Sequence, residues 1–449
     1  MLVKSKIFND YNKNYIFIIL SYGFFLGWML SFPYNGPIYE YLAQGYNFSG
    51  EYYPLAYIGV PIVFLVFFGY VNSKEKFPKR LLIYSIVVSL GGNLVLFFGV
   101  TYWYVIFTFM GIASVLFVVG WSYFYTISVS YKDKIKVMGL TIILGNTVEY
   151  LINLLVKMGL QIYALNTLIV VLAISLISAS FLDFQKSYDY AYDTSKDIRK
   201  LIFFVCAILF LINLNDGLSQ KLIEPFFKNI EFNLLFYRRI PYIMGIMVMV
   251  VFSDKISHTY SFYIALFLIG MANVVFMVLG VTEVGFYVNE TILQSGLGIG
   301  DLFAWTIVGH VGHLYGRPYK ITSFALIALL TSVFIGRVLG IIFLNYSEGG
   351  IYTIAVSYTT VFLTMLLIPK LIETIDRDVV KIKEKNKFES RIKSLTDREF
   401  QIYELLTKGK KNHEIAEDLF ISDNTLKTHL RNIYKKLNVA GKKELPIER

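Results

Sequence analysis

The sequence predicts an all-α protein, in which a polytopic helical membrane bundle of about twelve spans is followed by a small helical domain at the C-terminus. Three observations predict this fold class. Of the 449 residues, 56% are hydrophobic and only 16% are charged, which lies outside the range of soluble globular chains. Long apolar segments recur up to residue 369. Beyond that point the chain becomes charged and amphipathic.

Twelve segments have the length and apolar character of membrane spans, which need roughly 20 residues each. They cover approximately 15–32, 54–71, 81–99, 102–126, 137–156, 160–182, 201–215, 240–252, 261–280, 284–308, 321–345 and 351–368. The first is interpreted as a retained span because no small-residue cleavage site accompanies it. The seventh and eighth segments are short and poorly bounded, so ten or eleven spans remain alternatives.

The distribution of Lys and Arg predicts the orientation of these spans. With the N-terminus inside, the inner segments carry seventeen Lys and Arg residues and the outer segments carry five, including Arg238 and Arg239. Short cytoplasmic loops accumulate Lys and Arg. We therefore expect an even number of spans, with both termini cytoplasmic.

The arrangement of the spans resembles the major facilitator superfamily of transporters. A charged inner loop over 183–200 divides the spans six and six, which indicates two halves. Gly69, followed by Ser73, Lys74, Lys79 and Arg80, looks like a form of that family's loop between spans two and three that lacks the acidic residue. Ser253, Asp254 and Lys255 stand at the equivalent loop of the second half. The resemblance covers roughly the first 370 residues and implies a transporter-like bundle.

Ionisable residues inside spans are costly and mark function by default. Five such residues are candidates for a ligand-binding polar cavity: Glu149, Asp216, Glu290, Asp301 and Arg337. Glu149 lies beside Asn146 and Asn153 in the predicted fifth span. The alternative is an internal ion pair, such as Arg337 with Asp301 or Glu290, that fixes helix packing without binding a ligand.

No pattern in the sequence predicts catalysis, a metal site or a cofactor. Cys206 is the only cysteine, so no zinc pattern exists. His310 and His313 have metal-like spacing, but without a third ligand we interpret them as interfacial packing. Gln294–Asp301 is glycine-rich and could form a broken or closely packed helix, but it lacks the features of a nucleotide-binding loop. The chain is not expected to be an enzyme.

The charged segment 370–393 is predicted to form a cytoplasmic linker helix between the bundle, 1–369, and the last domain, 394–449. Ile372, Ile375, Val379 and Ile382 recur at a three-four alternation. This stripe covers only two heptads, fewer than a coiled coil needs. It could therefore pair two chains, or it could lean on the membrane surface or on the next domain.

Residues 394–445 predict three short helices. Thr396 and Glu399 form a capping box at the first helix start, and Gly409 can end that helix. The second covers about 412–420. Three apolar sets are expected to form the core: Ile402, Leu405 and Leu406; Ile415, Ala416 and Leu419; Leu426, Leu430, Ile433 and Leu437. The opposite face of the third helix is basic and polar, which suits a major groove but is equally typical of a solvated helix surface.

This segment is similar to the DNA-binding domain of LuxR-type regulators. That family's pattern is LTxRE, LLxxG, EIA, IS, TVKxH and IYxKL; the matching segments are 395–399, 405–409, 414–416, 421–422, 425–429 and 433–437, with Leu426 in place of the usual Val. The resemblance implies base contacts from Lys427, Thr428 and Arg431. It implies phosphate contacts from Thr425, His429, Lys435 and Lys436. Pro446 stands where the family continues into a fourth, often dimerising helix, so any dimer contact is expected from the linker or the bundle.

Together these patterns predict a membrane-bound transcription regulator in the bacterial inner membrane. Its expected partners are double-stranded DNA, the lipid bilayer and a small-molecule ligand of unknown identity, with a homodimer left open. A second hypothesis is a secondary transporter that carries a regulatory DNA-binding domain. A third is a membrane tether from which proteolysis releases the regulator.

Overall fold

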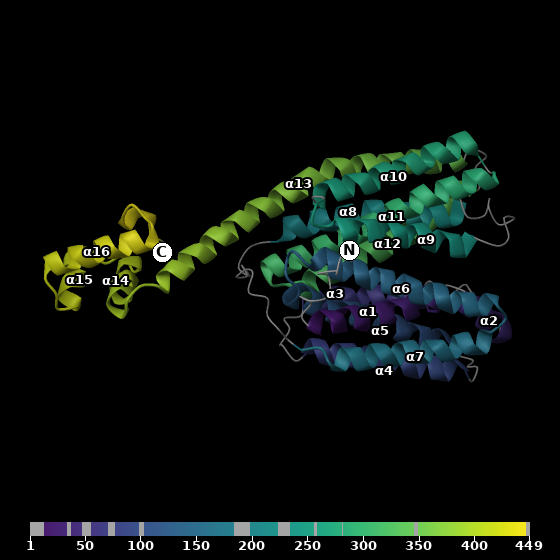
Figure 1. Ribbon diagram of the computed structural model, residues 1–449, viewed down its shortest axis with the longest axis horizontal. Coiled ribbons are helices and arrows are strands. Elements are labelled where there is room, and N and C mark those ends of the chain that lie inside the picture. The colour runs from purple at the N-terminus through teal and green to yellow at the C-terminus, as the bar shows by residue number, and fades with distance from the viewer. Residues whose placement is uncertain are drawn as a thin grey trace, which may run out of the picture. The chain divides into compact units, whose positions relative to one another are not determined.

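The computed structural model describes residues 13–33, 37–46, 55–70, 77–97, 103–183, 198–222, 234–255, 258–280, 282–344 and 349–445. Within these residues every secondary-structure element is a helix. The chain divides into two compact units, Met1–Ile375 and Asp376–Arg449 (Figure 1). The helical predictions for both parts are confirmed.

The first unit is a bundle of two sets of helices. The first set is α1 (Lys13–Ser31), α2 (Pro37–Tyr46), the π-helical turn η1 (Leu55–Gly59) with α3 (Val60–Phe68), α4 (Phe77–Phe97), α5 (Trp103–Ser128), α6 (Lys134–Lys157) and α7 (Gln161–Ser180). The second set is α8 (Arg199–Leu222), α9 (Leu234–Phe252), α10 (His258–Leu279), α11 (Glu283–Tyr315), α12 (Pro318–Leu344) and α13 (Gly349–Ile392).

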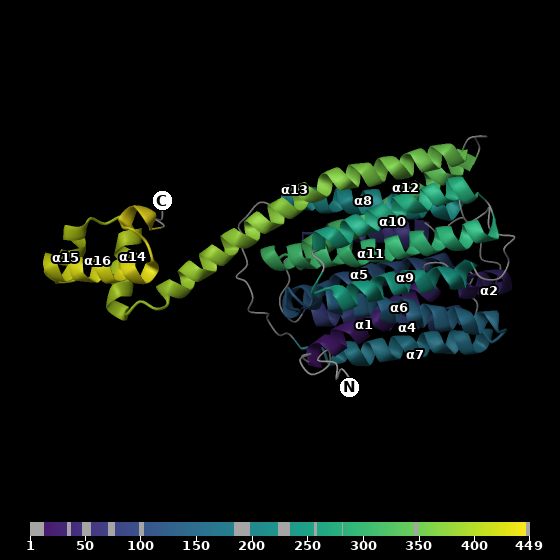
Figure 2. The ribbon, with the colours of Figure 1, turned by 45° about the horizontal axis from the view of Figure 1, so that its top comes forward.

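Each set packs mainly within itself. In the first half α1 packs on α6 and α7, and α4 on α5; in the second α8 packs on α12, and α11 on α9 and α10. Figures 1 and 2 show α4, α6 and α7 on one side of the bundle and α8, α10 and α13 on the other. Contacts of α6 with α9 and α11, and of α12 with α3 and α5, join the halves.

Nine of the described helices are long and apolar enough to cross a membrane: α1, α4–α7 and α10–α13. The apolar helix Tyr57–Phe68 is shorter. With α8 and α9 these make twelve helices that correspond in order to the twelve predicted spans. At the eighth predicted span, α9 begins at Leu234 and not at 240, and it therefore contains Arg238 and Arg239, which the sequence pattern places in an outer loop.

Close packing of α8 on α12 depends on glycine. A Cβ atom at Gly336 would lie 2.5 Å from the carbonyl oxygen of Leu214, and one at Gly217 would lie 2.4 Å from that of Val333. Such backbone approach is typical of membrane helix pairs, in which small residues let dispersion contacts form. The two glycines therefore set the distance between these helices.

We predict that Gly336→Ala destabilises the bundle by about 1–3 kcal/mol, the usual cost of overpacking, because the added methyl meets backbone atoms that cannot rotate away. Gly270→Ala in α10 is the matched control, since nothing lies within 4 Å of its added Cβ. Thermal unfolding of the purified chain in detergent measures both variants. Equal melting temperatures for the two would contradict this account of α8 and α12.

Candidate functional site

The second unit has a compact core made by three helices and a terminal turn. These are α14 (Asp397–Thr407), α15 (Asn412–Asp418), α16 (Asp423–Leu437) and the 3-10 turn η3 (Lys442–Glu444). The predicted core residues cluster as expected, with Leu405 and Leu419 only partly buried; the fully buried set also includes Tyr403 and Leu445. Because the apolar faces of the three helices pack against one another, the opposite face of α16 lies toward solvent.

Local caps fix where these helices begin and end. Thr396 Oγ1 accepts a hydrogen bond from the Glu399 amide at 3.3 Å, and the Thr396 amide donates to Glu399 Oε2 at 2.8 Å, so the predicted capping box is present. Ser422 Oγ accepts from the Thr425 amide at 3.1 Å and begins α16. Gly409, with φ of +82°, occupies the left-handed region after α14.

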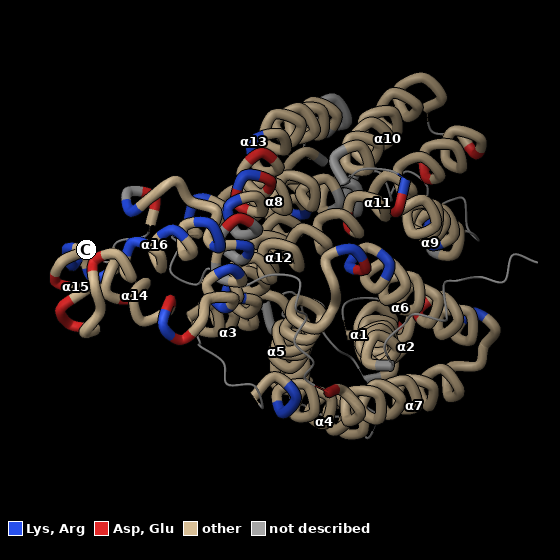
Figure 3. The backbone as a smooth tube through the Cα atoms, turned by 60° about the vertical axis from the view of Figure 1, so that its left-hand side comes forward, with Lys and Arg blue, Asp and Glu red and all other residues tan. Residues whose placement is uncertain are grey.

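The solvent face of α16 carries the predicted DNA-contacting residues. Thr425, Lys427, Thr428, Arg431 and Lys435 are exposed, and His429 is partly buried. They lie opposite Leu426, Leu430, Ile433 and Leu437, which are buried. In Figure 3 basic positions recur along α16. The exposed residues form a polar, positively charged strip at helical spacing, with donors for base edges and phosphates.

Lys436 forms an ion pair inside the domain. Its Nζ lies 2.6 Å from Oε2 of Glu399, whose side chain is buried. Burial raises the pKa of Glu399, but hydrogen bonds from Lys436 and Thr396 and the charge of Lys436 more than offset it, so the pKa is lowered. Sequence reasoning missed this contact, which ties α16 to α14.

In the bundle, two acidic candidates are paired with arginines of α9. Glu149 Oε1 on α6 accepts a hydrogen bond from Arg239 Nη2 at 2.7 Å. Glu290 Oε2 on α11 accepts from Arg238 Nε at 2.8 Å and from Gln294 Nε2 at 3.0 Å. The first pair links the two halves. The sequence pattern places both arginines in a loop and therefore does not predict these ion pairs. The available signal is that a glutamate inside a membrane span needs a cation as its partner.

The other predicted ligand residues lie elsewhere in the second half. Asp301 on α11 accepts a hydrogen bond from the Tyr242 hydroxyl of α9 at 2.8 Å. Arg337 lies on α12 and is partly exposed. The side chain of Asp216 lies outside the described residues. The structure therefore brings Glu149, Glu290 and Asp301 to helices that contact α9, and gives each a polar partner on α9.

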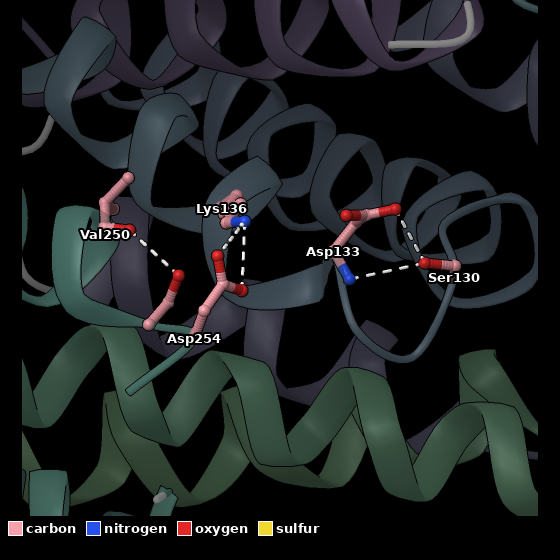
Figure 4. A network of polar contacts seen from close by, with 6 residues as sticks. Ser130, Asp133, Lys136, Val250 and Asp254 are labelled. Atoms are coloured by element: carbon pink, nitrogen blue, oxygen red, sulfur yellow. Dashed lines mark hydrogen bonds and ion pairs between the residues drawn. The ribbon is translucent and has the colours of Figure 1, made fainter. Parts of the chain in front are cut away.

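One end of the bundle holds a second set of contacts between the halves. Lys136 on α6 forms an ion pair with Asp254 after α9, at 2.8 Å (Figure 4). On α11, His313 Nδ1 lies 2.7 Å from the carbonyl oxygen of Thr126, and His310 Nε2 lies 3.1 Å from that of Tyr131. Both histidines thus pack at the interface between halves. Among the described residues no three His, Cys, Asp or Glu side chains gather to hold a metal ion.

Comparison with known proteins identifies the second unit. Residues 393–447 match the family model of bacterial regulatory proteins, luxR family. The chain is 46% identical over 54 residues to the HTH-type transcriptional regulator MalT of Vibrio campbellii, and 44% identical over 54 residues to that of Yersinia pestis. Each alignment covers 12% of this chain and only 6% of the relative. The C-terminal domain is therefore a LuxR-type helix-turn-helix, as the sequence predicts.

The fold of the bundle matches solved transporters. FucP, a Major Facilitator Superfamily transporter in the outward conformation, gives a TM-score of 0.58 at 12% identity, covering 79% of this chain and 99% of that chain. A bacterial homologue of the iron transporter ferroportin, in an outward-facing state, gives 0.56 at 12% identity, covering 80% and 98%. At this identity the likeness concerns the fold alone. The predicted major-facilitator-like architecture is confirmed.

We predict that Glu149→Gln destabilises the bundle, because it leaves Arg239 without its carboxylate. Breaking a buried pair costs about 3–5 kcal/mol, and we expect the lower end because the Arg239 side chain remains 31% exposed. Thermal unfolding in detergent measures the loss. The Glu149→Gln/Arg239→Gln double variant should recover part of the lost stability. If its loss of stability equals the sum of the losses of the two single variants, the pairing is contradicted.

The lowered pKa of Glu399 makes the stability of the DNA-binding domain depend on pH. Because its folded-state pKa lies below the unfolded value of about 4.3, the contact stabilises the domain above that value. The contribution is lost as pH falls through the folded-state pKa. Chemical denaturation of segment 376–449 between about pH 6 and pH 3 should show this loss for the wild type. The Glu399→Gln variant should not show this loss of stability at low pH. If its stability depends on pH in the same way as that of the wild type, the stabilising role of Glu399 is contradicted.

Proposed function

We propose that this chain is a membrane-bound DNA-binding transcription regulator that senses a small molecule through its transmembrane domain. The observation that carries the proposal is the joining, in one chain, of a LuxR-type domain with an exposed basic strip to a major-facilitator-like bundle. Helix α13 runs without interruption from Gly349 to Ile392 and contains the boundary between the two units. No catalytic step is part of the proposal.

The DNA-reading role falls on the exposed face of α16. Lys427, Thr428 and Arg431 would contact base edges, because donors at this position of a recognition helix reach the major groove. Thr425, His429 and Lys435 would contact phosphates, which position the domain without reading sequence. Lys436 would contribute a phosphate contact while it also holds Glu399. Its role is therefore expected to be partly structural.

The sensing role needs a bundle with two arrangements that a ligand binds unequally. Contacts that join the halves, such as Glu149 with Arg239 and Lys136 with Asp254, are suited to change between such arrangements. Because Thr360 and Ser357 of α13 accept hydrogen bonds from Asn215 of α8 and Asn273 of α10, a movement of the second half would carry along the helix that leads to the DNA-binding domain. Glu149, Glu290 and Asp301 are the ligand residues that this proposal favours, with Asp216 and Arg337 as further candidates.

The proposed location is the bacterial inner membrane, with both termini in the cytoplasm. The bias of Lys and Arg along the sequence supports this orientation, and access to DNA requires it. A homodimer is part of the proposal, because a helix-turn-helix dimer can bind two half-sites on DNA. The proposed contact is the part of the apolar stripe on α13 formed by Ile372 and Val379, which are partly exposed, whereas Ile375 is buried within the chain.

The alternative is a secondary transporter that carries a regulatory DNA-binding domain. The likeness of the bundle to transporter structures favours it. Uptake of a substrate into vesicles that contain the chain would support transport, whereas binding without net flux would support a sensor. A soluble C-terminal fragment that appears on induction would instead indicate release by proteolysis.

We predict that Arg431→Ala weakens specific DNA binding by about 1–3 kcal/mol and relaxes sequence preference, since it removes a base contact. Lys435→Ala should weaken binding to all sequences and reduce the salt slope by about one unit. Both side chains are exposed, so neither change should unfold the domain. Titration of DNA onto the full chain in nanodiscs at several salt concentrations measures the two effects. Identical behaviour of the two variants would contradict the assigned roles.

A further inference from the structure

One face of α6 carries hydrogen-bond acceptors that no described residue satisfies. Asn146, Glu149 and Asn153 follow one another at spacings of three and four, so their side chains share an arc of about 60° on the helix. All three are at least nine-tenths buried. Oδ1 of each asparagine and Oε2 of Glu149 accept no hydrogen bond from the described residues. A buried acceptor without a donor is costly, so three on one face require an explanation.

This face points toward the opposite half of the bundle. Gly139 lies one heptad before Asn146 on the same side of α6, and a Cβ there would meet side chains of Val250 on α9 and Leu302 on α11. Glu149 itself reaches Arg239 on α9. The acceptors thus line the region between α6 and α9, over a length of about 10 Å from Asn146 to Asn153.

The electrostatics of this region limit what it could hold. Arg239 neutralises Glu149 through Oε1, and Arg238 neutralises Glu290 on the neighbouring α11, so both buried glutamates have a cation. Neither of these two pairs offers a counterion to a further charge, which a buried site disfavours. The Arg239 side chain keeps 31% exposure although Glu149 keeps 5%, so the ion pair has one open end while the acceptor oxygens themselves are enclosed.

We propose that the α6 acceptor face, defined by Asn146, Glu149 and Asn153, binds an uncharged small molecule that bears several hydrogen-bond donors, such as hydroxyl or amide groups. The donors would satisfy the two asparagine oxygens and the second oxygen of Glu149. The ligand would bridge α6 and α9 and so would stabilise one arrangement of the two halves. This inference rests on the proposed sensing function only for its consequence at DNA.

The first experiment asks whether the asparagines serve the fold. Asn146→Leu and Asn153→Leu keep the branched shape of the side chain but remove the unsatisfied acceptors. We expect the full chain in detergent to melt at the same or a higher temperature with either change. The matched control is Asn273→Leu on α10, because the Asn273 amide donates to Ser357 Oγ at 2.8 Å and its loss should lower the melting temperature. If Asn146→Leu and Asn153→Leu lower the melting temperature as much as Asn273→Leu does, the proposal is overturned.

The second experiment uses defined probes: a library of uncharged monosaccharides, polyols and small amides, with putrescine and succinate as charged probes. We expect an uncharged probe to raise the melting temperature of the wild type. The Asn153→Leu variant should need about a tenfold higher concentration of that probe for the same rise, because one hydrogen bond is lost. Stabilisation by none of the uncharged probes would indicate that water alone satisfies the acceptors, and would overturn the proposal. Stabilisation by putrescine or succinate alone, or stabilisation that persists in Asn146→Leu and Asn153→Leu, would also overturn it.

The same probe separates this inference from the proposed function. A probe that stabilises the wild type through Asn146 and Asn153 and also changes DNA affinity of the full chain supports both. A probe that stabilises the chain but leaves DNA affinity unchanged supports the α6 acceptor face and contradicts the sensing function.

Discussion

A bundle that crosses a membrane has to satisfy its polar groups from within, and the contact between Glu149 and Arg239 is where that constraint matters most. Neither charge could remain in an apolar interior alone. Because one partner lies on α6 and the other on α9, neutralising the pair also joins the two halves. This contact gives Arg239 a partner inside the bundle and contributes to the packing of α6 against α9.

The DNA-binding domain obeys a different constraint, that of a small core in water. Three apolar stripes from α14, α15 and α16 have to meet, and this burial leaves the opposite face of α16 exposed to solvent. The buried Glu399 links capping and tertiary structure, since it closes the start of α14 and also receives Lys436. A domain built in this way presents its recognition helix in a fixed orientation.

Much of this structure could be predicted from sequence, because periodicity reports burial. The alternation of Leu426, Leu430, Ile433 and Leu437 sufficed to place α16, and hydropathy sufficed for the order of the membrane helices. Arg238 and Arg239 could not be placed by hydropathy, which scores an arginine as a loop residue whatever its partner. The contact between Lys436 and Glu399 spans two helices, so local pattern does not report it. Which residues contact a ligand or DNA remains a prediction from sequence and exposure.

The central claim is that a chain embedded in the membrane binds specific DNA. The most direct measurement is a genome-wide map of DNA bound by the full chain in its native host, together with fractionation that shows where the bound protein lies. We expect discrete enriched sites, with the bound protein intact and in the membrane fraction. A map without enriched sites, or one produced only by a soluble fragment, would contradict it.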